Sequence, residues 1–147
     1  MTVKHAKRLN KQDHRFMAIW ASDCAEHVLP YFEEMYPEDE RPRKAIEAAR
    51  AWARGTIPMV DARKAALASH SAARNTNNKA AQSAARAAGH AAATAHVVGH
   101  AHYAATFAVK SVTAAEISCS DIAAERDWQY KRLPEHLCAI VFPTLRH

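Results

Sequence analysis

The sequence predicts an all-α protein, and four observations carry that prediction. Alanine supplies much of the 49% hydrophobic fraction, only 3 glycines occur, and large apolar residues are few. Alanine has the highest helix propensity of the amino acids and a poor strand propensity. Residues 78–113 also form an alanine-dominated run of helix formers. We therefore expect a compact multi-helix bundle of about six to eight helices, several of them short and alanine-rich.

The length favours one domain. A chain of 147 residues has the commonest size of a single domain and can bury roughly two-thirds of the surface that its unfolded form exposes. We expect a single helical domain over residues 1–147, with residues 1–12 as a loose N-terminal segment because they are mostly polar.

The first helix is predicted to begin at His14, where Asp13 can act as its N-cap. Pro30 interrupts the helical pattern because proline lacks a backbone N–H, so a short second segment is expected over residues 31–36. Apolar residues at helical spacing predict one buried stripe, made of Phe16, Met17, Ile19, Trp20, Cys24, Val28 and Leu29.

Proline and glycine mark the limits of the next helices. A helix is expected from about Pro42 to Arg54, and Gly55 is the expected left-handed stop. Pro58 and Asp61 then open another helix, which the asparagines of residues 75–78 end. Its inward-facing residues are predicted to be Val60, Ala65, Leu67 and Ala68.

The alanine-rich run is expected to let neighbouring helices approach closely, because its alanines recur three and four residues apart. Val97, Val98 and Gly99 are its weakest helical point, so we predict a break between residues 93 and 99. A helix from Ala114 to about Lys131 should place Ile117, Ile122, Ala124 and Trp128 on one side and Glu125 on the other. A last short helix, over residues 135–142, should seal the bundle.

The charge and the cysteines limit the partners and the compartment. The net charge of +5 favours acidic partners or nucleic acid, but the only dense basic group, over residues 41–54, lies beside Glu38, Asp39, Glu40 and Glu47. Nucleic acid is therefore not favoured. The three cysteines form no CxxC pair, and no stretch approaches ~20 apolar residues without charge. We expect a cytoplasmic protein that does not contact the membrane.

Two histidines form the only candidate metal site. His96 and His100 are four residues apart and would lie about 40° apart around one helix, so they could donate two ligands to zinc. Asp23, Cys24, Glu26 or His27 could supply a third ligand. Val97 stands where a zinc peptidase of the HExxH type needs its glutamate, which excludes that class. Hydrogen-bonded histidines without a metal are the alternative, and we expect no cofactor.

Candidate partner-binding residues gather in two other places. Residues 23–27 put an acid, a thiol and an imidazole within about one turn, although Cys24 also falls on the apolar stripe and is better read as a buried hydrophobe. A tryptophan among charges, as at Trp128, is typical of an interface anchor. The predicted partner-binding residues are Asp23, Glu26, His27, Glu33, Glu34, Asp39, Asp127 and Trp128, and no residue is predicted to be catalytic.

Three segments, residues 20–55, 85–101 and 125–137, resemble a bacterial all-α family labelled putative immunity protein, the Imm5-like group. The resemblance implies a small cytoplasmic protein that neutralises a toxin by direct binding and is not an enzyme. Because the chain is basic, a nuclease toxin is not favoured unless acidic residues such as Glu33, Glu34, Glu38 and Asp39 cluster on the binding face. The alternative is a helical protein that binds a metal or small ligand through its histidines.

Overall fold

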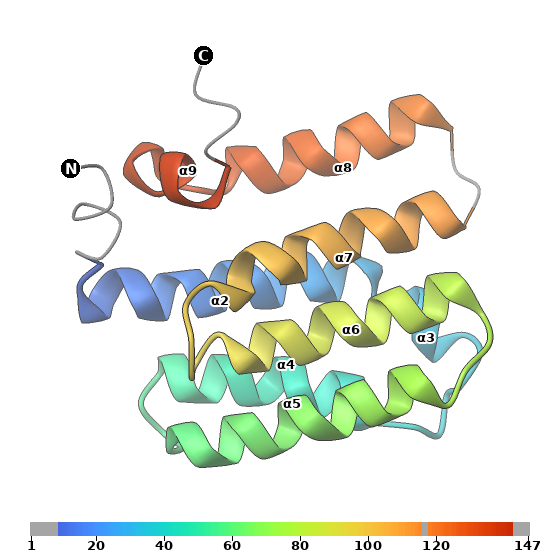
Figure 1. Cartoon of the computed structure of the whole chain (residues 1–147), viewed down its shortest axis with the longest axis horizontal. Helices are drawn as coiled ribbons and strands as arrows, with labels where there is room; N and C mark the ends of the chain where they lie inside the picture. The colour runs from blue at the N-terminus through green and yellow to red at the C-terminus, as the bar shows by residue number, and fades with distance from the viewer. Residues whose placement is uncertain (1–8, 116–117, 143–147) are drawn as a thin grey trace.

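The computed structural model describes residues 9–115 and 118–142, and within these ranges every regular element is a helix (Figure 1). The prediction of an all-α fold is confirmed. In chain order the eight described helices are α2 (Lys11–Val28), α3 (Pro30–Glu33), α4 (Arg41–Ala53), α5 (Met59–Arg74), α6 (Lys79–Ala93), α7 (His100–Ala114), α8 (Cys119–Lys131) and α9 (Glu135–Val141).

Helix α2 begins earlier than predicted. The side chain of Asn10 accepts a hydrogen bond of 2.7 Å from the backbone N–H of Asp13, so Asn10 is the N-cap and the helix starts at Lys11. Asp13 lies in the first turn, where a carboxylate complements the helix dipole. Most of the predicted stripe is buried, but Ile19 is 40% exposed, which corrects that part of the prediction.

Helix α4 ends as predicted. Gly55 has a φ of +80°, in the left-handed region that favours glycine. Its N–H donates to the carbonyl of Trp52, and the N–H of Thr56 donates to the carbonyl of Ala51, both at 2.9 Å. These two bonds form a Schellman motif, which satisfies carbonyls that the helix end would otherwise leave without partners.

Helix α5 turns a different face inward from the one predicted. Val60 and Leu67 are 52% and 58% exposed, and the buried residues are Ala62, Ala66, Ser69, Ala72 and Ala73. The prediction assumed that the largest apolar side chains face the core. Here the neighbouring helix is lined with alanine, and only a face of small residues lets two helices approach closely.

Helix α6 lies at the centre of the bundle and packs against α2, α3, α4, α5 and α7. Eight alanines and Gly89 form its buried surface. Helices α5, α6 and α7 lie side by side as one layer over α2 and α4, and α8 and α9 run along the edge beside α7 (Figure 1). The predicted break is confirmed, since α6 ends at Ala93 and α7 starts at His100.

Buried polar side chains connect these helices by donating to backbone carbonyls of their neighbours. Ser69 of α5 donates to the carbonyl of Ala85 in α6 at 2.8 Å, and Ser111 of α7 donates to that of Ala80 at 2.7 Å. In the part of the chain that the structure describes, no buried side-chain nitrogen or oxygen lacks a hydrogen-bond partner. The alanine-lined helices therefore gain specific contacts without an unsatisfied polar group.

The C-terminal helices agree in part with the prediction. Helix α9 seals the bundle with Leu137, Cys138 and Val141, all buried. In α8, however, Ala124 is exposed and Glu125 is 5% exposed, the reverse of the expected sides. Ile117 lies outside the described residues. No helix in the described ranges combines the length and the apolar character that crossing a membrane requires.

Candidate partner-binding site

A surface pocket of about 270 Å³ lies between α2 and α8. Its lining residues are Asp23, Glu26, His27, Trp128 and Arg132. The first three are spaced three and four residues apart on α2, and the last two are four residues apart across the end of α8, so each helix presents one face to the pocket. We call these five residues the α2–α8 pocket.

The indole of Trp128 forms the aromatic wall of the pocket. The imidazole of His27 stacks on it with ring centroids 4.1 Å apart and 18° between the planes. The guanidinium of Arg132 lies 4.7 Å from the centroid of the same indole, which is a cation–π contact. The indole is therefore held by two neighbours while part of its surface remains open to solvent.

Arginines hold the two carboxylates of the pocket. Arg50 of α4 donates to both Asp23 and Glu26 at 2.8 Å, and Arg132 donates to Asp23 at 3.2 Å. The hydrogen bond from Arg50 lowers the pKa of Glu26, and that pair in turn raises the pKa of Arg50. Both carboxylates are thus held in fixed orientations by arginine before any partner arrives.

Beneath the pocket lies Glu125, a buried carboxylate. The Nδ1 atom of His27 lies 2.7 Å from one of its oxygens, and the amide of Gln129 donates to the other at 3.3 Å. A buried carboxylate is costly without partners, so the contact between Glu125 and His27 is strongly favoured. The same contact fixes the orientation of the His27 ring that stacks on Trp128. The indole N–H of Trp20 donates to the backbone carbonyl of Gln129 at 2.9 Å and anchors α8 to α2.

Cys24 cannot act as a nucleophile in this arrangement. Its side chain is fully buried, and burial raises the pKa of its thiol well above the usual value, with a further contribution from the charges of Glu125 and Asp23. A thiol with a raised pKa stays protonated at neutral pH, whereas the thiolate is the reactive form. The interpretation of Cys24 as a buried hydrophobe agrees with this environment.

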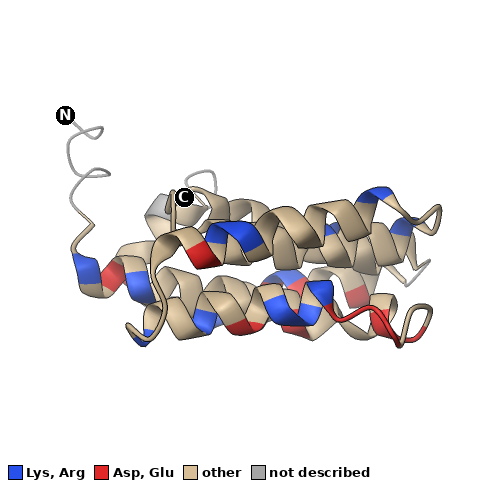
Figure 2. Ribbon diagram, turned by 90° about the horizontal axis from the view of Figure 1, so that it is seen from below, with Lys and Arg blue, Asp and Glu red and all other residues tan. Residues whose placement is uncertain are grey.

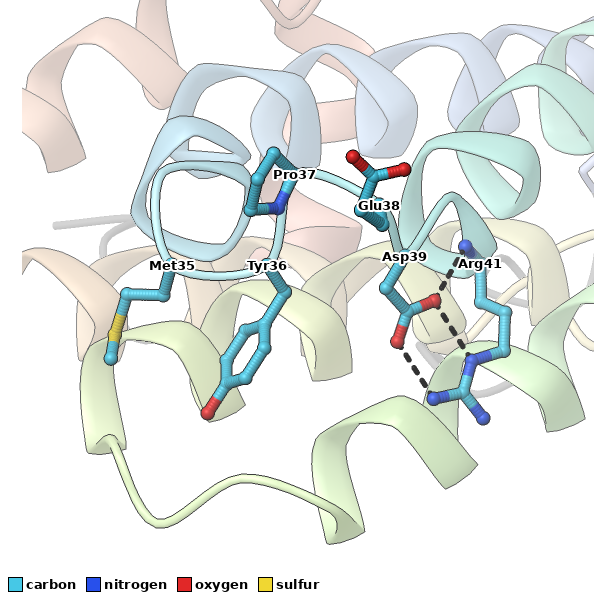
Figure 3. Close-up of a pocket in the computed structure, with 6 residues that line it drawn as sticks. All are labelled: Met35, Tyr36, Pro37, Glu38, Asp39 and Arg41. Atoms are coloured by element: carbon cyan, nitrogen blue, oxygen red, sulfur yellow. Dashed lines mark hydrogen bonds and ion pairs between the residues drawn. The ribbon is translucent and has the colours of Figure 1, made fainter.

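A second hollow, of about 490 Å³, lies in the loop between α3 and α4. Figure 3 shows Met35, Tyr36 and the Asp39–Arg41 pair pointing to one side of the loop, while Pro37 and Glu38 point to the other. Arg41 donates to both carboxylate oxygens of Asp39, at 2.9 and 2.7 Å, which lowers the pKa of Asp39. Its charge is thus neutralised locally.

The other predicted partner-binding residues do not line the α2–α8 pocket. Glu33 forms two hydrogen bonds with Arg43, and Asp127 pairs with Lys131 one turn further along α8. Glu34 is exposed, and Asp39 lines the second hollow. The structure therefore brings together Asp23, Glu26, His27 and Trp128 and leaves the remaining four elsewhere.

His96 and His100 do not share a helix. His96 is exposed in the turn after α6, whereas His100 begins α7 and lies with its Nδ1 2.9 Å from Nδ1 of His90. From the sequence we expected His90 to point away from His96 and His100, and its contact with His100 shows that this expectation was wrong. Among the described residues, no group of three or more His, Cys, Asp or Glu side chains is arranged to hold a metal ion.

Sequence reasoning missed three residues of this site. Arg132 and Arg50 reach Asp23 from α8 and α4, and Glu125 supports His27 from below. Trp128 and Gln129 lie three and four residues after Glu125, and Arg132 lies four and three residues after them, so this spacing could have shown a shared helix face. No local signal joins Arg132 to Asp23, which is 109 residues away in the chain.

The fold and the site define a small helical protein with a preorganised, charged and aromatic surface pocket. Such a surface is typical of proteins that act by binding. The chain belongs to the family described as Imm-5 like putative immunity protein, whose family model matches residues 7–136. No curated protein and no solved structure matches the chain.

Proposed function

We propose that the protein is an immunity protein that binds and neutralises a bacterial toxin by protein–protein contact through the α2–α8 pocket. Membership of the immunity-protein family supports a protein partner. The observation that carries the choice of surface is the pocket itself, where Trp128 and Arg132 lie beside two fixed carboxylates. Tryptophan and arginine are enriched among the residues that dominate binding energy in interfaces.

The ion pairs of the pocket suit an inhibitor that binds as a rigid body. Asp23 and Glu26 already pair with Arg50, and Arg132 pairs with Asp23, so binding a partner orders few side chains. Ordering a long side chain at an interface costs about 0.5–1.5 kcal/mol, which a preorganised surface avoids. A partner residue with a cationic or amide head could contact the carboxylates while its stem packs on Trp128.

The proposed function is binding without catalysis in this chain. The protonated, buried Cys24 leaves no activated thiol beside His27. We further propose that the protein is cytoplasmic, because an inhibitor in the cytoplasm meets its toxin before the toxin is exported. Zinc binding by His96 and His100 stays a prediction, which metal analysis of the purified protein and of His96→Ala would test.

The test of the proposed function is neutralisation of a toxin encoded by a reading frame that adjoins this gene. We expect the two products to co-purify and the toxicity to disappear on co-expression. Arg132→Glu and Trp128→Ala should each weaken binding by about 2 kcal/mol or more, about 30-fold in Kd. Matched controls are Lys131→Glu and Tyr130→Ala on the same helix, which should change Kd little.

Two results would contradict the proposal. If no product of an adjoining reading frame binds or is neutralised, the function is wrong. If a toxin binds and Arg132→Glu and Trp128→Ala, shown to be folded by circular dichroism, bind it as tightly as the natural chain, the function stands and the α2–α8 pocket is not the interface.

A further inference from the structure

The layer formed by α5, α6 and α7 has an unusual charge. Residues 62–115 contain no aspartate or glutamate, yet they carry Arg63, Lys64, Arg74, Lys79, Arg86 and Lys110. Figure 2 shows the contrast with the rest of the chain, where acidic residues (red) gather in the loop before α4 and mix with basic residues (blue) on α2 and α4. Helix α5 does contain an acidic residue, Asp61, which lies in its first turn just before this stretch.

On α5 and α6 the cations of this layer lie on one stripe of each helix, except Lys64, which lies about 100° round α5 from Arg63. Helix α7 carries the single cation Lys110. At about 100° per residue, Arg63 and Arg74 of α5 fall within about 20° of one another, and Asp61 lies about 160° round the helix from Arg63. Lys79 and Arg86 of α6, seven residues apart, also lie on one stripe. That stripe holds all the residues of α6 that are not buried.

Side-chain contacts join the three stripes into one face. Arg86 of α6 donates to Nδ1 of His70 in α5 at 2.9 Å. On the other side, the ring of His90 in α6 lies 5.4 Å from that of Tyr103 and 5.3 Å from that of Phe107, both in α7. Lys110 lies over the Phe107 ring at 4.7 Å. We call this surface the cationic face.

Among the residues that the structure describes, no carboxylate pairs with the cations of this face. Within residues 9–115 and 118–142, no ion pair involves Arg63, Arg74, Lys79, Arg86 or Lys110. The arginines of α4 differ, since Arg41, Arg43 and Arg50 each pair with a carboxylate. A group of unpaired cations on one face attracts a polyanion.

Flat rings lie among these cations. Tyr103 is 51% exposed, and its ring contacts those of His90 and His100. Burial lowers the pKa of His90 to about 3 and that of His70 to about 4, so both imidazoles are neutral at pH 7. The exposed ring of Tyr103 therefore packs against the neutral ring of His90, and it lies on the same stripe of α7 as Lys110, seven residues further along.

We propose that the cationic face binds single-stranded nucleic acid, with Arg63, Arg74, Lys79, Arg86 and Lys110 contacting phosphates and the ring of Tyr103 stacking on a base. Single-strand-binding surfaces combine cations that follow the backbone with aromatic rings that stack on bases. Nucleic-acid interfaces are strongly positive, whereas protein–protein interfaces are depleted in lysine, which favours a nucleic acid over an acidic protein.

The chain order conceals this surface. Arg63 and Lys110 are far apart in the sequence, and the only dense basic group lies in α4 beside carboxylates. Sequence reasoning therefore did not favour nucleic acid. Folding places the scattered cations on adjacent stripes, because α5, α6 and α7 pack side by side and no carboxylate occurs after Asp61 in these helices.

The test is fluorescence anisotropy of a labelled 20-nucleotide oligo-dT titrated with the full chain. We expect binding whose log K falls with log salt at about 0.7 per phosphate contacted, a slope near −3.5 for five contacts. Affinity should then fall about 100-fold between 50 and 200 mM NaCl. An absence of binding at 50 mM NaCl would overturn the proposal.

A matched pair of charge variants separates this face from the net charge. The triple variant Arg74→Glu, Lys79→Glu, Lys110→Glu should lose at least about ten-fold in affinity. The control triple variant Lys44→Glu, Arg54→Glu, Lys131→Glu has the same net charge and changes exposed cations away from the face. Equal losses in both would show attraction by net charge alone and would overturn the proposal.

Stacking has its own test. Tyr103→Leu keeps apolar volume but removes the flat ring, and we expect about a five-fold loss or more for oligo-dT. Tyr130→Leu, which changes another exposed tyrosine, is the control. Tighter binding of a 20-base-pair duplex, or equal competition by poly-L-glutamate of the same charge, would overturn the assignment to single strands and favour a duplex or an acidic protein.

Discussion

Gly89 is required by the ring that packs against it. A Cβ atom at this position would lie 2.6 Å from Cε1 and 2.7 Å from Nε2 of His70. The ring cannot move without leaving the guanidinium of Arg86, which donates to its Nδ1. Glycine inside a helix is otherwise unfavourable by about 1 kcal/mol relative to alanine. The packing of His70 is the physical reason for this residue.

We predict that Gly89→Ala lowers the free energy of unfolding by about 1–3 kcal/mol, because overpacking outweighs the gain in helix propensity. Urea denaturation measures the change. Gly99→Ala is the control, since Gly99 has a right-handed φ of −60° and a new Cβ there would have only Val97 at 4.0 Å. If Gly89→Ala is as stable as Gly99→Ala, the contact with His70 does not restrict this position.

Glu125 depends on His27 for its main polar contact. We predict that His27→Ala lowers the free energy of unfolding by about 1–3 kcal/mol, because a buried carboxylate then keeps only Gln129 as a partner. Adding Glu125→Gln to that variant should recover part of the loss, since a neutral amide is less costly to bury. Thermal denaturation of the two single variants and the double variant measures the coupling.

The control for this pair is His136→Ala. His136 contacts Asp13 at 3.1 Å, but its side chain is 62% exposed, and exposed ion pairs contribute about 0–1 kcal/mol. A loss from His27→Ala no larger than that from His136→Ala would mean that Glu125 reaches water without its partner.

At the scale of elements, α6 is defined by the size of its side chains. Ala84 and Ala88 are fully buried between helices, whereas Ser83 lies on the partly exposed stripe of the same helix. Ala88→Leu is predicted to lower the free energy of unfolding by about 1–3 kcal/mol or more, because the neighbouring helices must separate. Ser83→Leu adds a leucine side chain without that cost, and urea denaturation compares the two.

The histidines that join α5, α6 and α7 make the bundle sensitive to acid. Burial lowers the pKa of His70 to about 4 and that of His90 to about 3, below their usual value of 6.5. At a pH between the usual pKa of 6.5 and these lowered pKa values, the unfolded chain therefore binds more protons than the folded chain. The contribution of both residues is fully present above pH 6.5 and is lost as the pH falls toward 4 and 3.

We predict that the urea midpoint falls between pH 7 and pH 5 and that His90→Gln makes this fall shallower. His102→Gln, which changes an exposed histidine of α7, should leave the slope unchanged. The measurements stop at pH 5 because two carboxylates also affect stability in more acidic solution. Arg50 and Arg41 lower the pKa values of Glu26 and Asp39, so the stability that these ion pairs contribute is lost when the carboxylates are protonated. An identical slope in His90→Gln would assign the acid sensitivity to other groups.

At the scale of the molecule, stability is distributed unevenly. Helix α6 contacts five other helices, whereas α8 buries only Glu125 and Gln129. We predict that native-state hydrogen exchange of α6 amides requires opening with nearly the full free energy of unfolding. Amides of α8 should exchange through a smaller opening. Equal protection of both helices would indicate that α8 unfolds only together with the whole bundle.

Much of the fold could be predicted from the sequence because its signals are local. Gly55 and the residues around Val98 set helix limits through their own backbone preferences. The inward face of α5 could not be predicted, because the choice between Leu67 and Ala66 depends on the neighbouring helix. From side-chain size alone, Leu67 is the residue expected to face the core. Instead Ala66 is buried, because the alanine surfaces of α5 and α6 pack closely together.

The candidate site was predictable only where its residues are neighbours in the sequence. Asp23, Glu26 and His27 lie within two turns of α2, and Trp128 was recognised from its charged surroundings. Arg132 reaches Asp23 only because α8 packs along α2, which the chain order does not indicate. Long-range ion pairs depend on tertiary packing, so the sequence shows which residues can pair but not which ones do.

The serines between the helices have a consequence for how the bundle is aligned. A surface of alanines looks nearly the same after a shift of one helical turn, about 5.4 Å, so alanine contacts alone permit several axial alignments. Ser69 reaches the carbonyl of Ala85, and Ser111 reaches that of Ala80, in one alignment only. A shift would leave these buried hydroxyls without partners. Two small polar side chains thus select a single register for helices that could otherwise slide past one another.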